Sequence, residues 1–167
     1  MSRNIMRGTV IDSSSLILIY KSGLIMHFLD LYAPVIPESV SRELTVPGHD
    51  GADLFRKFCN EGSITVLKPC LEEARVITGT LHTGERDVIL LFYEGQGDYI
   101  IIDDRKGGAF CRDNGIPYIN ALLSVKILFL KGKITEKIFI NAWDRVIEIG
   151  RYSQSIVVWA ENAGMEK

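Results

Sequence analysis

Short apolar runs alternate with longer amphipathic segments along most of this chain. Five runs are short, rich in β-branched residues and bounded by turn residues, which is typical of buried strands. These predicted strands cover residues 8–12, 34–37, 64–67, 99–102 and 116–119. Between them, apolar residues recur with the spacing of a helix face. The predicted helices cover residues 16–20, 24–31, 37–44, 50–60, 85–93, 105–114, 121–130 and 134–149. Strands that alternate with helices in this way predict an α/β fold with a mainly parallel sheet.

The strongest strand in this pattern is the YIII run at 99–102, which is β-branched and apolar on both faces. A strand of this kind is covered on both faces, so we expect it near the centre of the sheet. The stretch at 157–159 is ambiguous between strand and helix. The chain has no internal repeat, low-complexity segment or linker. Residues 1–167 are therefore predicted to form a single domain, in which 134–167 is a C-terminal helical extension.

Length and charge narrow the range of functions. The chain has 167 residues, a formal net charge of −2 and a sequence pI of about 5.9. A protein that binds nucleic acid through a broad basic face usually carries a positive excess, so such binding would depend on a local basic rim or on bound cations. No run reaches the roughly 18 apolar residues of a membrane span, and the N-terminus has no long apolar signal region. We therefore expect a soluble, cytoplasmic protein.

The three cysteines, Cys59, Cys70 and Cys111, are widely spaced and form no CxxC pair. A zinc site built on thiolates is therefore not expected. In a reducing cytoplasm, the default for such residues is a buried free thiol.

Two of the predicted strands end directly on acidic residues. The GTVI run is followed by Asp12, and the YIII run is followed by Asp103 and Asp104. In a parallel sheet, sites form at the carboxyl ends of the strands. We therefore expect these acids to lie at one edge of the sheet, although they are far apart in the sequence.

Further acids belong to predicted helices that begin near the same edge. Glu43 lies about one and a half turns into the helix that follows the strand at 34–37. Glu85 and Asp87 lie in the first turn of the helix that leads to the YIII strand. These positions predict a cluster of carboxylates rather than isolated acids.

A cluster of carboxylates points to a divalent metal ion. Carboxylates packed together repel one another, and Mg²⁺ or Mn²⁺, which prefer oxygen ligands, relieve that repulsion. Such ions lower the pKa of a bound water, orient it toward phosphorus and stabilise the leaving oxygen. The chain has no credible Ser–His–Asp or Cys–His arrangement, which favours this metal-dependent chemistry.

Each acid also has an ordinary structural interpretation. Asp12 could only cap the following helix, Glu43 could be a solvated helix residue, and Glu85 could only compensate a helix dipole. The Asp103–Asp104 pair could be a turn that leads into a helix cap. Their joint position at one sheet edge favours the metal site over coincidence.

Four segments together resemble a PIN domain. They read VIDSSSLILIYKSG, VIPESVSREL, LHTGERDVILL and YIIIDDRKGGAFCRDNGIPYIN, and the likeness covers roughly residues 8–135. It is strongest to predicted nucleic-acid-binding PIN proteins whose acidic helix begins Gly-Glu and whose fourth strand ends Asp-Asp. The resemblance implies a three-layer α/β/α sandwich and a ribonuclease that depends on Mg²⁺ or Mn²⁺ and hydrolyses phosphodiester bonds. It also implies an RNA substrate, a homodimer and, in many members, an antitoxin protein as the partner of a toxin.

The resemblance assigns roles to individual residues. Asp12 matches the first acid of the family and Ser14 the small hydroxyl two places later. The fourth acid is Asp104 or Asp103, because many members read Thr-x-Asp where this chain reads Ile102-Asp103-Asp104. The implied catalytic residues are Asp12, Glu43, Glu85 and Asp104. The implied metal ligands are Asp12, Glu85, Asp103 and Asp104, and the supporting residues are Ser14, Asp87 (an alternative to Glu85) and Arg105.

Other interpretations stay open. Arg105, Lys106 and Arg112 either contact phosphates at the rim of the site or form a solvated face. His82 could line the site, although a surface position is the simpler reading, and Trp159 reads as a core or interface anchor. The alternative function is a catalytically degenerate PIN module that binds nucleic acid or protein. A flavodoxin-like nucleotide or receiver domain is less compatible, because its phosphoacceptor strand is not evident.

Overall fold

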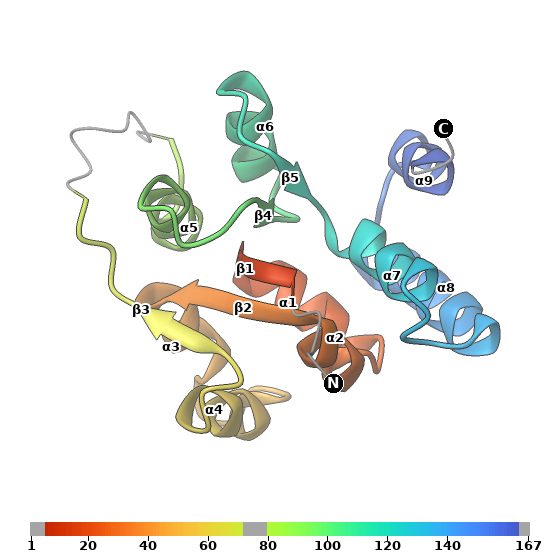
Figure 1. The fold of residues 1–167 in the computed structure, drawn as a ribbon, viewed down its shortest axis with the longest axis horizontal. Helices are drawn as coiled ribbons and strands as arrows, with labels where there is room; N and C mark the ends of the chain where they lie inside the picture. The colour runs from red at the N-terminus through yellow and green to blue at the C-terminus, as the bar shows by residue number, and fades with distance from the viewer. Residues whose placement is uncertain (1–5, 72–79, 164–167) are drawn as a thin grey trace.

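A computed structural model of the chain describes residues 6–71 and 80–163. Figure 1 shows a central sheet with helices packed around it and the last helix beside α7. Within the described residues, the sheet has five strands, all parallel, in the order β3-β2-β1-β4-β5. The strands are β1 (Met6–Ile11), β2 (Tyr32–Pro37), β3 (Thr65–Leu67), β4 (Ile100–Ile101) and β5 (Tyr118–Ile119). The predicted α/β class and parallel sheet are confirmed.

The expected central position of the YIII run is confirmed in part. β4 lies inside the sheet between β1 and β5, while β1 is the middle strand. Ile100, Ile101 and Ile102 are buried, as expected for a strand covered on both faces. The strand itself has only two residues, because Ile100 and Ile101 are the positions that pair with both neighbouring strands.

All five strands alternate with helices. The helices described are α1 (Ser13–Lys21), α2 (Ile25–Leu31), α3 (Glu38–Leu44), α4 (Ala52–Asn60), α5 (Thr83–Tyr93), α6 (Arg105–Asp113), α7 (Ala121–Leu130), α8 (Glu136–Gly150) and α9 (Gln154–Asn162). The ambiguous stretch at 157–159 is helical. Side chains of Asp12, Asp104, Asn120 and Thr135 cap α1, α6, α7 and α8 by accepting a backbone N–H from the first turn.

The helices form layers on the sheet. α5 packs against β1, β2 and β4, whereas α1 contacts α2, α3, α7 and α8, and α7 packs along α8. This arrangement is the α/β/α sandwich of the PIN-like fold. α8 and α9 both pack on α7, so the segment after residue 134 adds two helices to one end of the molecule.

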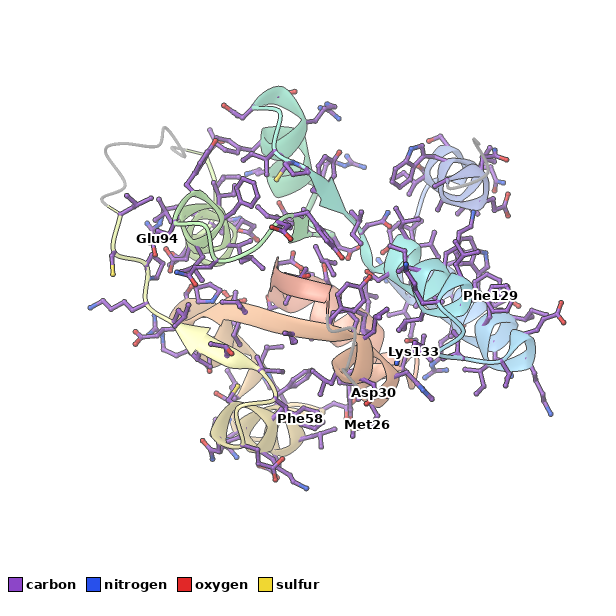
Figure 2. All side chains as sticks on the ribbon, viewed as in Figure 1. Met26, Asp30, Phe58, Glu94, Phe129 and Lys133 are labelled. Carbon is purple, nitrogen blue, oxygen red and sulfur yellow. The ribbon has the colours of Figure 1, made fainter. Side chains whose placement is uncertain are left out.

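Polar contacts fix two of the connections between layers. The ammonium group of Lys133, in the turn after α7, lies 4.0 Å from a carboxylate oxygen of Asp30 on α2. Glu94, at the end of α5, accepts backbone N–H groups from Cys70 (2.5 Å) and Leu71 (2.8 Å). Figure 2 labels Asp30, Lys133 and Glu94 among the side chains. These contacts tie the ends of α5 and α7 to neighbouring segments.

The core is continuous and apolar. Residues from all five strands and both helical layers contribute, and Phe28 stacks on Tyr32 with ring centroids 4.5 Å apart. All three cysteines are free. Cys111 is buried, Cys59 is half-buried and Cys70 is exposed, so the expectation of buried thiols is confirmed only for Cys111. Burial and the nearby Asp12 raise the pKa of the Cys111 thiol to about 12. Among the described residues, no helix is long and apolar enough to cross a membrane.

Candidate active site

The order of the strands creates a switch point between β1 and β4. The chain moves outward from β1 to β2 and β3, and then returns to the other side of β1 with β4 and β5. Loops at the carboxyl ends of the two strands diverge at such a point and leave a crevice, which is where open parallel sheets bind their ligands. Asp12 follows β1 directly, and Asp103 lies two residues after β4. Two acids therefore lie at the carboxyl ends of the strands on either side of this switch point.

Asp12 and Asp103 are in contact through Ser15. The backbone N–H of Ser15 donates to Oδ1 of Asp12 (2.8 Å), and its hydroxyl donates to Oδ2 of Asp103 (2.6 Å). The backbone N–H of Asp103 lies 3.4 Å from Oδ2 of Asp12. Asp12 is only 3% exposed. Asp12 therefore caps α1, as the structural interpretation expects, and also faces a second carboxylate.

Two further groups hold Asp103 from the C-terminal half of the chain. Its Oδ2 accepts the backbone N–H of Ala121 at the start of α7 (2.9 Å), and its Oδ1 accepts the hydroxyl of Tyr152. Burial and then Asp103 itself raise the pKa of the Tyr152 phenol, which keeps it a proton donor at neutral pH. Both oxygens of Asp103 are therefore occupied by donors.

Burial raises the pKa of both acids in this pair. Burial first, and then repulsion from Asp103, raise the pKa of Asp12 from 3.8 to about 7. Burial also raises the pKa of Asp103, although hydrogen bonds from Ser15, Tyr152 and Ala121 oppose that shift. Near neutral pH the pair accordingly favours a proton or a cation, because two buried carboxylates repel each other.

Glu43, on α3, contacts Ser13 at the start of α1, the helix that Asp12 caps. Its Oε2 accepts the hydroxyl of Ser13 (2.6 Å), and its Oε1 lies 3.1 Å from where a Cβ would stand on Gly84, in the first turn of α5. The glycine therefore leaves room for the carboxylate at the start of α5. Glu43 itself is exposed to solvent. Ser14, the hydroxyl named by the resemblance, is exposed, while its neighbours Ser13 and Ser15 bond to the acids.

Glu85 and Asp87 have different surroundings. Oε2 of Glu85 is buried and has no hydrogen-bond partner in the described residues. In contrast, Asp87 accepts the hydroxyl of Ser39 (2.7 Å) and the guanidinium of Arg86 (3.1 Å). A buried carboxylate oxygen without a partner is costly and suggests a missing cation or donor. The contacts therefore favour Glu85 as the ligand and give Asp87 a structural role.

Asp104 and Glu85 both lie close to Gly107, in the first turn of α6. Its Oδ2 accepts the backbone N–H of Gly107 (2.8 Å) as the cap of α6. A Cβ on Gly107 would stand 3.5 Å from Cγ of Glu85. The two neighbouring aspartates thus turn to different partners: Asp103 toward Asp12, and Asp104 toward the helix that Glu85 contacts.

As the side chains lie, no group of three or more His, Cys, Asp or Glu residues within the described ranges is close enough to hold a metal ion. The chemistry of the donors nevertheless fits a hard cation. All are carboxylate oxygens, Glu85 has an unpartnered buried oxygen, and burial together with repulsion from Asp103 raises the pKa of Asp12. Mg²⁺ and Mn²⁺ match this donor set.

The basic residues after the acid pair are all exposed. Arg105 and Arg112 line a pocket beside Asp103 and Asp104, while Lys106 is outside its lining. His82 is the exposed residue before α5 and makes no side-chain cap bond. Trp143 is buried, whereas Trp159 is half exposed on α9, so only the first is a core anchor.

Ser13, Ser15 and Tyr152 are the residues at the site that the sequence does not reveal. The run of three serines predicts hydroxyls here, but which of them face the acids depends on the rotation of α1. Tyr152 reaches Asp103 from a segment that carries no acidic or glycine-rich motif.

A family model described as a PIN domain matches residues 8–158 of the chain. No curated protein and no solved structure matches it.

Proposed function

Because this chain belongs to the PIN domain family, whose members are generally nucleases, we propose that it is a divalent-metal-dependent endoribonuclease that hydrolyses phosphodiester bonds in RNA. The observation that carries this proposal is the acid pair of Asp12, which is buried, and Asp103, which is half-buried, at the switch point of the sheet. A buried pair of like charges is destabilising unless a proton or cation accompanies it. A divalent metal ion bound between the two carboxylates would remove this repulsion.

Asp12 and Glu85, with Asp104 or Asp103, are proposed to hold Mg²⁺ or Mn²⁺. The unpartnered oxygen of Glu85 and the raised pKa of Asp12 support this choice. Of the two neighbouring aspartates, Asp104 uses one oxygen to cap α6, while both oxygens of Asp103 accept hydrogen bonds. When bound, the ion supplies a water of lowered pKa and stabilises negative charge on the leaving oxygen.

Glu43 is proposed to accept the proton of the attacking water. It is exposed, so water reaches it, and the hydroxyl of Ser13 fixes one carboxylate oxygen while the other is directed toward Gly84. The water oxygen forms a bond to phosphorus as the bond to the leaving oxygen breaks, and Glu43 takes the water proton. The leaving oxygen then takes a proton from solvent. Ser13 and Ser15 act as positioning residues for Glu43 and Asp103.

Cleavage of a labelled single-stranded RNA in Mn²⁺ tests this assignment. Asp12→Asn keeps the cap of α1, because asparagine also caps helices, but it removes the charge. We expect wild-type protein to cleave and Asp12→Asn to fall to background. Asp103→Asn and Asp104→Asn, assayed in parallel, identify the fourth acid by the larger loss. Equal cleavage by wild-type and Asp12→Asn protein would refute the role of Asp12.

The alternative is a catalytically degenerate PIN module that binds nucleic acid or protein. Its support is the lack of a preformed group of three metal-binding side chains among residues 6–71 and 80–163. Isothermal titration with Mn²⁺ separates the two functions. Metal binding that depends on Glu85, together with cleavage, supports the enzyme, whereas RNA binding without either supports the module.

A homodimer and an antitoxin protein remain predictions from the PIN resemblance. Sedimentation of the purified chain tests the dimer. If a small protein is encoded beside this one, adding it is expected to lower RNA cleavage, and an unchanged rate would contradict its role as an antitoxin.

A further inference from the structure

We infer that the pocket between α6 and α9 binds a segment of single-stranded RNA and leads it to the acid cluster. This inference rests on the proposed ribonuclease function and names the part of the chain that would hold the substrate. The pocket has a volume of about 540 Å³, within the roughly 300–1,000 Å³ of small-ligand sites. It is therefore large enough for a nucleotide-sized group.

The pocket opens directly onto the acids. Asp103 and Asp104 form part of its lining, and so does Tyr152, which contacts Asp103. A strand that occupies the pocket would consequently continue past the carboxyl end of β4. This contact with the acids distinguishes the pocket from the smaller one beside Asp87, whose lining includes neither Asp103 nor Asp104.

The charge at the rim suits a phosphate backbone. Arg105, Arg112 and Arg151 line the pocket and are all exposed. Within the described residues, Arg105 and Arg151 have no ion-pair partner, and Arg112 contacts only the adjacent, exposed Asp113 at 3.4 Å. Three guanidinium groups are therefore available to phosphates in a chain whose net charge is −2. Because the net charge of the protein is negative, RNA binding depends on a local basic rim, and these arginines form one.

An aromatic side chain lines the same pocket as these arginines. Trp159 on α9 lines the pocket and is 50% exposed, so its ring is accessible to a ligand there. Exposed aromatic rings beside a basic groove bind unpaired bases by stacking, without a requirement for sequence. Bases inside a duplex are already stacked, so this arrangement favours a single strand. The hydroxyls of Ser153 and Ser155 add polar groups to the same wall.

A binding measurement tests the pocket separately from cleavage. We would titrate a short, fluorescein-labelled oligoadenylate with full-length Asp12→Asn protein in Mg²⁺ and follow fluorescence anisotropy. On this background, Trp159→Ala is expected to weaken binding on the order of tenfold, whereas Trp159→Phe retains a ring and most of the affinity. Arg112→Ala and Arg151→Ala are each expected to reduce the slope of log K against log salt by about 0.7.

Lys57→Ala is the matched control. Lys57 is an exposed cation on α4, which Figure 1 shows on the opposite side of the molecule from α6 and α9, and the substitution is expected to leave the affinity unchanged. Absence of oligoadenylate binding, or equal losses in Lys57→Ala and Arg151→Ala, would overturn the inference. So would a change from dimer to monomer in Trp159→Ala with unchanged RNA affinity, since α9 would then be a protein interface.

Cleavage assays separate this inference from the proposed function. If wild-type protein cleaves RNA and Trp159→Ala cleaves it with unchanged KM, the pocket is not the substrate groove although the enzyme assignment stands. If the oligoadenylate binds with the expected losses but no metal ion supports cleavage, the groove stands and the ribonuclease assignment fails.

Discussion

The phenolic hydroxyl of Tyr152 donates a hydrogen bond to Oδ1 of Asp103, a residue 49 positions earlier in the chain. This contact connects the segment between α8 and α9 to the carboxyl end of β4. The segment between α8 and α9 therefore contributes directly to the surroundings of Asp103.

Removing the hydroxyl should weaken the folded state. Tyr152→Phe leaves a partly buried carboxylate with one donor fewer, and hydrogen bonds to charged groups contribute about 1.5–3 kcal/mol. We expect the free energy of unfolding in urea at pH 8 to fall by about that amount. The pKa of Asp103 should also rise, because the bond from Tyr152 lowers it. The exposed Tyr93 is the control: Tyr93→Phe should change the unfolding free energy by less than about 0.5 kcal/mol.

The two candidate acids of α5 can be separated by metal-induced stabilisation. Glu85→Gln should abolish the rise in Tm that Mn²⁺ causes, because its unpartnered oxygen is the proposed ligand. Asp87→Asn should lower the Tm without metal, since it weakens the contact with Arg86, but it should keep the rise on adding Mn²⁺. If Asp87→Asn abolished the rise and Glu85→Gln kept it, Asp87 would be the metal ligand and Glu85 the structural residue. Differential scanning fluorimetry with EDTA and with Mn²⁺ measures both.

Stability without metal should decrease as the pH rises. Asp12 binds a proton more tightly in the folded chain, where its pKa is about 7, than at its ordinary value of 3.8. Its stabilising effect is therefore complete below about pH 4 and is lost progressively as the pH rises toward about 7; a shift of this size corresponds to about 4 kcal/mol. Urea midpoints in EDTA should be lower at pH 8 than at pH 5.

Two further measurements test whether Asp12 is the group that causes this pH dependence. Asp12→Asn should flatten most of the slope, because asparagine does not titrate. Mn²⁺ should raise the midpoint of wild-type protein more at pH 8 than at pH 5, since protons compete with the metal for the same oxygens. A slope that is identical in both proteins would assign the titration to another group.

Adjacent glycines of α6 should respond differently to a methyl group. A Cβ on Gly107 would lie 2.3 Å from Cδ1 of Ile102, which is itself buried, so Gly107→Ala should cost about 1–3 kcal/mol of stability. Gly108→Ala meets only the ring of Tyr118 at 3.6 Å, an ordinary contact. Since alanine favours helix, that variant should be neutral or up to about 1 kcal/mol more stable. Thermal unfolding followed by circular dichroism compares them.

The fold was predictable because its signals are local. Strand runs such as the one ending at Asp12 and helix periods such as the one starting near Glu85 are properties of short windows, and parallel sheets bring strand ends together. The approach of Asp12 and Asp103 follows from those two facts.

The remaining details of the site depend on tertiary packing. The rotation of α1 determines that Ser13 and Ser15, and not Ser14, face the acids. The docking of α8 and α9 brings Tyr152 to Asp103, and no local pattern encodes a contact between segments so far apart. The different partners of Asp103 and Asp104 likewise depend on where β4 ends and α6 begins.

The strand order also affects how the protein is made. β1 leaves the ribosome well before β4, which pairs with one of its edges, and Asp103 comes 91 residues after Asp12. Until then, that edge of β1 lacks a partner strand, and Val10 and Ile11 lack their final cover. Open apolar edges invite pairing with other chains. Nascent or truncated chains that stop before β4 are accordingly expected to aggregate, and the acid cluster assembles only once synthesis has passed that strand.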